Sequence, residues 1–81
     1  MSKKTLEQCK SGDDFYRLAR RSENLISERQ CGSHVVLTAR KGSATVARHN
    51  GDMAKGTASA LRKRFVVIGL AVLVVLLVAI L

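Results

Sequence analysis

The sequence is poor in acidic and aromatic residues, and it contains neither proline nor tryptophan. One tyrosine and two phenylalanines leave little for a stacked-base mode of single-strand binding. Six acidic residues against 14 lysines and arginines give a net charge of +8, and residues 65–81 carry no charged side chain. The positive excess therefore lies on residues 1–64, where it favours a polyanionic partner such as RNA, DNA or anionic lipid.

Residue patterns that bind metal ions are missing from the sequence. No CxxC pair or Cys/His cluster has the spacing of a zinc site, and no pair of carboxylates is placed for two-metal chemistry. We therefore expect neither a metal nor another cofactor. Because no apolar leader precedes Cys9 and Cys31, we expect both thiols to be reduced. Cys31 is interpreted as a small hydrophobic residue that is buried or half-buried beside Gly32. The alternative is a reactive or metal-binding thiol.

The chain divides into three segments by composition. Residues 1–10 are polar and contain lysine, and we interpret them as a mobile arm that adds phosphate contacts. Residues 11–70 have the length of one small domain with a thin core. Residues 71–81 form a purely apolar tail.

A first helix is predicted from Ser11 onward. Ser11 and Asp14 have the S-x-x-D form of a capping box, and Phe15 and Ala19 follow at helical spacing. The opposite face carries arginines, which are either RNA contacts or a solvated face. These are Arg17, Arg20 and Arg21.

Three short strands are predicted at residues 25–29, 33–39 and 44–47, which are separated by glycine-containing turns. Gly42 supplies the positive φ that a tight hairpin needs. A second helix begins at Gly56 and Thr57 and is ended by a C′ glycine at Gly69. Its apolar side consists of Ala58, Leu61, Phe65 and Ile68.

The resulting fold class is α+β, with the order α-β-β-β-α. We expect a three-stranded antiparallel sheet with two helices on one face, followed by an apolar C-terminal helical tail.

Three short motifs stand in this order along the predicted elements. They are Cys31-Gly32-Ser33-His34, Thr45-Val46-Ala47-Arg48-His49 and Lys55-Gly56-Thr57. With their order and spacing, residues 10–70 resemble the HicA toxin family of mRNA interferases, whose fold is similar to a double-stranded-RNA-binding domain. Ile68-Gly69-Leu70 also looks like the end of that family's last helix.

The resemblance implies a ribonuclease toxin of a toxin-antitoxin stress-response system, which acts on mRNA in the cytoplasm. It implies that His34 is catalytic and that a HicB-type antitoxin covers the active site. The sequence departs from the family at Ala47, where a proline is common, and in residues 71–81, which the family pattern does not explain.

RNA cleavage without a metal requires a base for the 2′-hydroxyl proton and an acid for the leaving 5′-oxygen. Imidazole, with a pKa of about 6.5, suits both roles. The chain contains two histidines, His34 and His49. His34 is predicted as the general base or acid, with a hydrogen-bonded sheet-edge histidine as the alternative. His49 is either the second member of the pair or a phosphate contact.

Cations near these histidines are the candidate RNA contacts. Lys41, Arg40 and Arg48 are predicted to hold the scissile phosphate, and Lys55 is a further RNA-binding candidate. Ser33 is interpreted as a turn hydroxyl, because no acidic residue is placed to orient a Ser-His pair.

The apolar residues 65–81 allow a second interpretation. As one helix, these 17 residues reach about 25 Å, which is at the short limit for a membrane span. If Phe65 and Ile68 cover the sheet, however, only residues 70–81 remain, and these reach about 18 Å. That length is too short to span a membrane. Three outcomes are open: a membrane anchor that removes the second helix from the domain, an interfacial or oligomerising apolar flap, or a frameshifted or truncated end. The alternative functions are a tail-anchored basic membrane protein without enzyme activity and a noncatalytic RNA-binding module.

Overall fold

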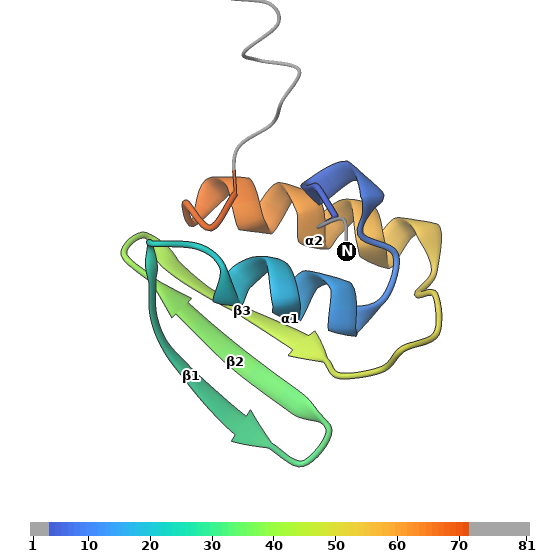
Figure 1. Ribbon diagram of the computed structural model, residues 1–81, viewed down its shortest axis with the longest axis horizontal. Coiled ribbons are helices and arrows are strands. Elements are labelled where there is room, and N and C mark those ends of the chain that lie inside the picture. Colours follow the sequence, from blue (N-terminus) through green and yellow to red (C-terminus); the bar gives the residue numbers. More distant parts are fainter. Residues whose placement is uncertain (1–3, 72–81) are drawn as a thin grey trace, which may run out of the picture.

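The structure is a computed structural model and describes residues 4–71 of the chain (Figure 1). Its elements are a 3₁₀ turn at Leu6–Gln8, α1 at Gly12–Arg20, β1 at Leu25–Cys31, β2 at His34–Ala39, β3 at Gly42–Ala47 and α2 at Lys55–Val67. The α+β class, with a three-stranded antiparallel sheet and two helices, is confirmed.

The sheet is an antiparallel meander in the order β1-β2-β3. Cys31 pairs with His34 across the turn at Gly32, whose φ is 59°. Gly42 has a φ of 146°, so the predicted hairpin glycine has the conformation that side chains disfavour. β1 continues to Cys31 instead of ending at Arg29, because its turn uses two residues where the sequence pattern indicated three.

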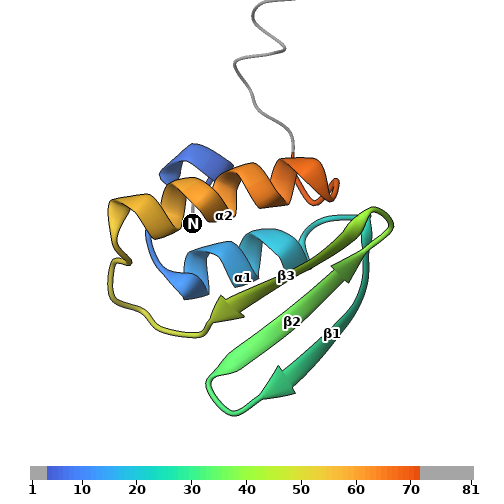
Figure 2. The ribbon, with the colours of Figure 1, turned by 180° about the vertical axis from the view of Figure 1, so that it is seen from behind.

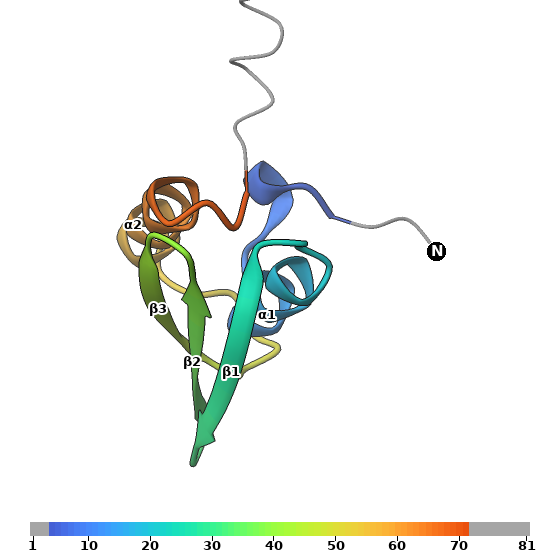
Figure 3. The same ribbon diagram turned by 90° about the vertical axis from the view of Figure 1, so that its left-hand side faces the viewer.

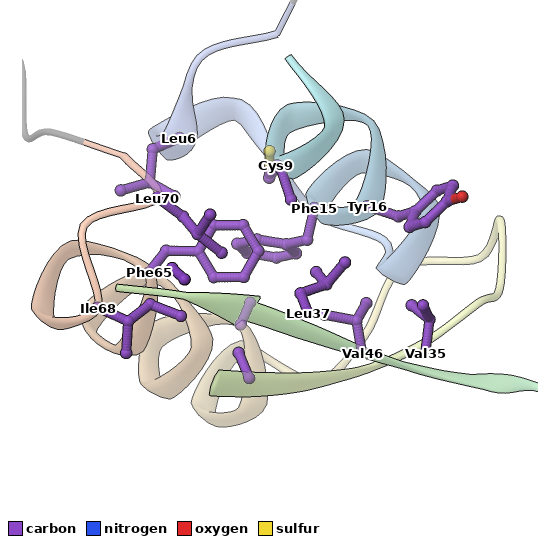
Figure 4. Close-up of a cluster of buried hydrophobic side chains, with 14 residues drawn as sticks. Leu6, Cys9, Phe15, Tyr16, Val35, Leu37, Val46, Phe65, Ile68 and Leu70 are labelled. Carbon is purple, nitrogen blue, oxygen red and sulfur yellow. The ribbon is translucent and has the colours of Figure 1, made fainter. Parts of the chain in front are cut away.

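The core lies between the sheet and the two helices, which cover the same face of it (Figures 1 and 3). Alternate side chains of β2 and β3 are buried there. The rings of Phe15 and Phe65 meet edge to face with their centroids 5.3 Å apart, and so join α1 to α2 (Figure 4). The buried apolar residues are Leu6, Cys9, Phe15, Tyr16, Ala19, Val35, Leu37, Ala39, Ala44, Val46, Ala58, Phe65, Ile68 and Leu70.

α1 begins at the capping box that the sequence predicts. The Ser11 hydroxyl accepts the Asp14 N–H at 3.1 Å, and the Asp14 carboxylate accepts the backbone N–H groups of Ser11 and Lys10 at 3.2 and 3.0 Å. The Lys4 ammonium donates to the same carboxylate at 3.1 Å. Burial by itself raises the pKa of Asp14, but these donors outweigh burial and hold the pKa below its ordinary value of 3.8.

Residues 4–10 are part of the fold, which corrects the expectation of a mobile arm over residues 1–10. Leu6 and Cys9 are 3% and 0% exposed and lie against the core (Figure 4). The two residues are three positions apart, so a single 3₁₀ turn places both on one side of the segment. Residues 1–3 of the predicted arm lie outside the described residues.

The two cysteines are free and have opposite surroundings. Burial raises the pKa of the Cys9 thiol to about 11, and the Asp14 carboxylate adds to this effect. Cys31 is exposed at the end of β1, so its interpretation as a buried or half-buried hydrophobe is wrong. The physical reason is that Cys31 pairs with His34, which lies on the face of the sheet opposite the buried Val35, so Cys31 also lies on the face that the helices do not cover.

α2 ends at the predicted C′ glycine. Gly69 has a φ of 85°, its N–H donates to the Val66 carbonyl at 3.1 Å, and the Leu70 N–H donates to the Phe65 carbonyl at 2.9 Å. These bonds form a Schellman motif, and the buried side chains of Leu70 and Phe65 supply its hydrophobic contact.

The apolar residues 65–70 belong to the domain core, since Phe65, Ile68 and Leu70 are all buried. These three side chains are therefore packed in the domain in this structure. Apart from Ala71, the predicted helical tail over residues 71–81 lies outside the described residues. Within residues 4–71, no helix is both long enough and apolar enough to cross a membrane.

Candidate nucleic-acid interface

His34 stands at the first position of β2, beside the turn at Gly32, and its side chain is exposed. It pairs with Ala47 of β3. The Arg48 N–H donates to the carbonyl of Ser33 at 2.7 Å, so the end of β3 fixes the backbone just before the imidazole. Within residues 4–71 the imidazole has no hydrogen bond or ion pair, and the alternative of a hydrogen-bonded edge histidine finds no partner there.

His49 lies in the loop that leads from β3 to α2 (Figure 2). Its N–H donates to the Ala47 carbonyl and its carbonyl accepts the Asp13 N–H, both at 3.0 Å. Gly12 makes this close approach of α1 to β3 feasible, because a Cβ at this position would collide with the Ala47 carbonyl oxygen. The backbone of His49 is thus fixed by α1 while its imidazole is exposed.

His34 and His49 are both among the residues that line one open groove of about 950 Å³ between β3 and α2. Gly56 and Thr57, at the start of α2, line the same groove. The structure therefore brings together residues from all three motifs on which the family resemblance depends.

Arg64 is a groove residue that the sequence motifs did not assign to the site. Its Nε donates to the Ser43 carbonyl at 2.9 Å, which connects α2 to the edge of β3. Thr57, Leu61 and Arg64 follow one another at helical spacing and share one face of α2. Helical spacing counted from the Gly56-Thr57 motif is the sequence signal by which Arg64 could have been found.

Arg17 and Arg20 of α1 and its C-cap residue Arg21 contact the protein's own polar groups. The contacts are Arg17 with the Asp14 carboxylate at 4.0 Å, Arg20 with the Glu28 carboxylate at 3.5 Å, and Arg21 with the Lys4 carbonyl at 2.8 Å. α1 approaches β3 at Gly12, which lines the groove, whereas none of the three arginines is among the groove-lining residues. These predicted RNA contacts therefore lie apart from the two histidines.

Arg48 is next to His49 in the sequence, but its guanidinium is directed at α1. It stacks on the Tyr16 ring at 4.2 Å from the centroid, and its Nε lies 3.7 Å from the Asp13 carboxylate. A stacked and paired guanidinium links the end of β3 to α1. Its predicted contact with the scissile phosphate remains a prediction.

Arg40 and Lys41 form the turn between β2 and β3, at the opposite end of these strands from His34. A rise of about 3.4 Å per residue places this turn about 17 Å from His34. The structure therefore separates Arg40 and Lys41 from the two histidines, and their contact with the scissile phosphate stays a prediction. Lys55, at the start of α2, lines a second and smaller hollow.

The described part of the chain, residues 4–71, holds no group of three His, Cys, Asp or Glu side chains placed to bind a metal ion. The titratable side chains lining the groove, apart from Arg64, are His34, His49 and Asp52. Proton transfer between imidazoles and a substrate is the chemistry that this set supports most directly.

Comparisons of the chain with protein-family models, with curated protein sequences and with solved structures find no match. A functional assignment therefore depends on the groove itself and on the motifs that line it.

Proposed function

We propose that this chain is a metal-independent endoribonuclease that cleaves mRNA in the cytoplasm and serves as the toxin of a toxin-antitoxin pair. The observation that carries the proposal is the convergence of His34, His49 and the Gly56-Thr57 helix start on one groove. These residues belong to the motifs that resemble the HicA family, and two exposed imidazoles at one groove provide an acid and a base.

The reaction is a transesterification at phosphorus. One imidazole takes the proton of the ribose 2′-hydroxyl, and the 2′-oxygen forms a bond to phosphorus. The bond from phosphorus to the 5′-oxygen breaks, and the second imidazole gives that oxygen a proton. The products are a 2′,3′-cyclic phosphate and a 5′-hydroxyl end. Each imidazole transfer contributes about 10²- to 10⁴-fold to the rate.

The charge of the domain supports RNA as the substrate. The net charge of +8 lies on residues 1–64, and Arg64 stands in the groove itself. Cations around a phosphodiester stabilise the additional charge that develops in the transition state. A HicB-type antitoxin that covers this groove is the expected protein partner.

The test compares RNA cleavage by the wild-type chain and by His34→Ala, in buffer with a chelator of divalent ions. We expect His34→Ala to lower the cleavage rate by about 10²- to 10⁴-fold, and wild-type products to carry 5′-hydroxyl ends. Thr38→Ala is the matched control, since Thr38 lies on the same strand and the same face as His34 but outside the groove.

Three results would contradict the proposal. Undiminished cleavage by a folded His34→Ala variant would remove His34 from the mechanism. Products with 5′-phosphate ends would exclude attack by the 2′-hydroxyl. RNA binding that survives the loss of His34, with no cleavage by the intact chain, would identify a noncatalytic RNA-binding module.

A further inference from the structure

β3 forms a free edge of the sheet, and its outward backbone groups face the groove. In an antiparallel strand the N–H and C=O of one residue point to the same side, and successive residues alternate. The Ser43 carbonyl accepts Arg64 Nε from α2, and the Ala47 carbonyl accepts the His49 N–H. Thr45, midway between them, therefore directs its N–H and C=O into the groove.

The Thr45 backbone groups have no partner across the groove within residues 4–71. A strand edge with one open N–H and one open C=O is a template for another extended chain. Phosphate oxygens of RNA only accept hydrogen bonds, so RNA phosphates leave the Thr45 carbonyl without a donor. A peptide backbone supplies a donor and an acceptor at the right spacing.

The two walls of the groove differ in chemistry. On the side of the core, Ala44, Ala60 and Leu61 present small apolar groups. On the outer side, the strand carries Thr45 and borders the exposed His34. A strand laid along β3 has side chains that alternate between these walls, and it therefore fits best when apolar and polar residues alternate.

The positive charge around the groove indicates which polar residues the docked strand carries. The chain carries a net charge of +8, and Arg64 at the groove is one of its cations. The single carboxylate among the groove-lining residues, Asp52, lies in the loop before α2, away from Ser43 and Arg64. An acidic strand is complementary to such a site, and its association is accelerated by the field.

We propose that the free edge of β3 docks an extended segment of the inhibitor protein, with alternating apolar and acidic residues, as a fourth strand of the sheet. The segment pairs with the Thr45 backbone and covers His34 and His49. This inference rests on the proposed function, because it assigns to the antitoxin the way in which it blocks the groove.

The experiment uses the full chain and a fluorescent peptide of alternating valine and glutamate as the probe. The probe is prepared in two further forms, with N-methyl groups on alternate backbone amides in one or the other register. Binding is followed by fluorescence anisotropy, and amide exchange of Thr45 is followed by NMR. We expect the probe to bind and to protect the Thr45 amide. One methylated form loses about tenfold in affinity and the other binds as before.

In the protein, Thr45→Pro is the test variant and Thr45→Val is its control. Proline removes the outward N–H without removing a bond to β2, since edge strands tolerate proline when its nitrogen faces outward. We expect Thr45→Pro to bind the peptide about tenfold more weakly and Thr45→Val to bind it as the wild type does. If Thr45→Pro does not fold, the methylated peptides still decide the question.

Equal binding of the two methylated forms, or no protection of the Thr45 amide, would overturn the docked strand. Tighter binding of a valine-lysine peptide would overturn the acidic partner, and RNA protecting the Thr45 amide in place of the peptide would identify RNA as the occupant of the edge. The proposed function is tested separately by His34-dependent cleavage. If cleavage is intact and the peptide does not bind, only the docking inference fails. If the peptide binds along β3 and no RNA is cleaved, the enzyme assignment fails.

Discussion

The α1 side of the domain and the β3-α2 groove differ in how their charges are compensated. On the α1 side, three carboxylates have cationic partners. The pairs are Asp13 with Arg48, Asp14 with Lys4 and Arg17, and Glu28 with Arg20. In the groove, both imidazoles are exposed, and neither has an ion pair within residues 4–71.

This difference shows how a chain with few acids creates a cationic site. Half of its six acidic residues are used to fasten α1 to the rest of the domain, where they neutralise nearby arginines. The positive excess is thereby left on the hairpin turn, on α2 and around the groove. Arg48 bridges the two regions, because its side chain belongs to the paired set while its backbone fixes the residue before His34.

Gly12→Ala should disturb both regions most, because Gly12 lies at the point where they touch. The added methyl group collides with the backbone oxygen of Ala47, so α1 and the end of β3 must separate. We expect a loss of about 1–3 kcal/mol in the free energy of unfolding, measured by urea denaturation. RNA cleavage by the folded fraction should fall as well, because Asp13 no longer holds the His49 backbone.

Gly51→Ala is the control for this substitution. Gly51 lies in the loop near His49, does not have a positive φ, and has open space where the added methyl group would lie. It should leave the free energy of unfolding within about 0.5 kcal/mol of the wild type. If Gly12→Ala is as stable and active as Gly51→Ala, the contact between α1 and β3 does not position the site.

The paired region should also be sensitive to acid through Asp14. Burial raises the pKa of Asp14, but the donors from Lys10, Ser11 and Lys4 outweigh it and lower the pKa below 3.8. The ionised form therefore stabilises the fold above about pH 3.8, and this contribution is lost as the pH falls through the lower folded-state pKa. We expect Asp14→Asn to unfold about 1 kcal/mol more easily at neutral pH and to lose less stability on acidification.

Urea denaturation at a series of pH values measures this effect, with Glu23→Gln as the control. Glu23 is exposed and has no ion pair within residues 4–71, so its variant should keep the wild-type dependence on pH. Parallel pH curves for Asp14→Asn and the wild type would show that the carboxylate does not fasten the start of α1.

Local sequence signals predicted the elements well where a single residue determines the backbone. Ser11 starts α1, Gly42 turns the hairpin and Gly69 ends α2, as the capping and turn rules indicate. The same rules missed Leu6 and Cys9, because two apolar residues in a polar segment make no periodic pattern. Their burial depends on a 3₁₀ turn at Leu6–Gln8 that packs both side chains against the core.

The candidate site was predictable in its histidines but not in its cations. Motif spacing selected His34 and His49, and the groove includes both. Charge alone did not separate Arg48, which stacks on Tyr16, from Lys41, which lies at a distant turn. That distinction depends on which carboxylates come close in space, and the sequence does not contain this information locally.

A comparison of Lys41→Met with Arg20→Met tests which cations contact RNA, and we expect its effects to be small. Lys41 is exposed and has no ion pair within residues 4–71, whereas Arg20 is paired with Glu28. We expect Lys41→Met to reduce the salt slope of RNA binding by about 1 and to leave stability unchanged. Arg20→Met should keep that slope and unfold up to about 1 kcal/mol more easily. Equal losses of slope in the two variants would mean that bound RNA also covers α1, and the contrast between the two regions would then not extend to binding.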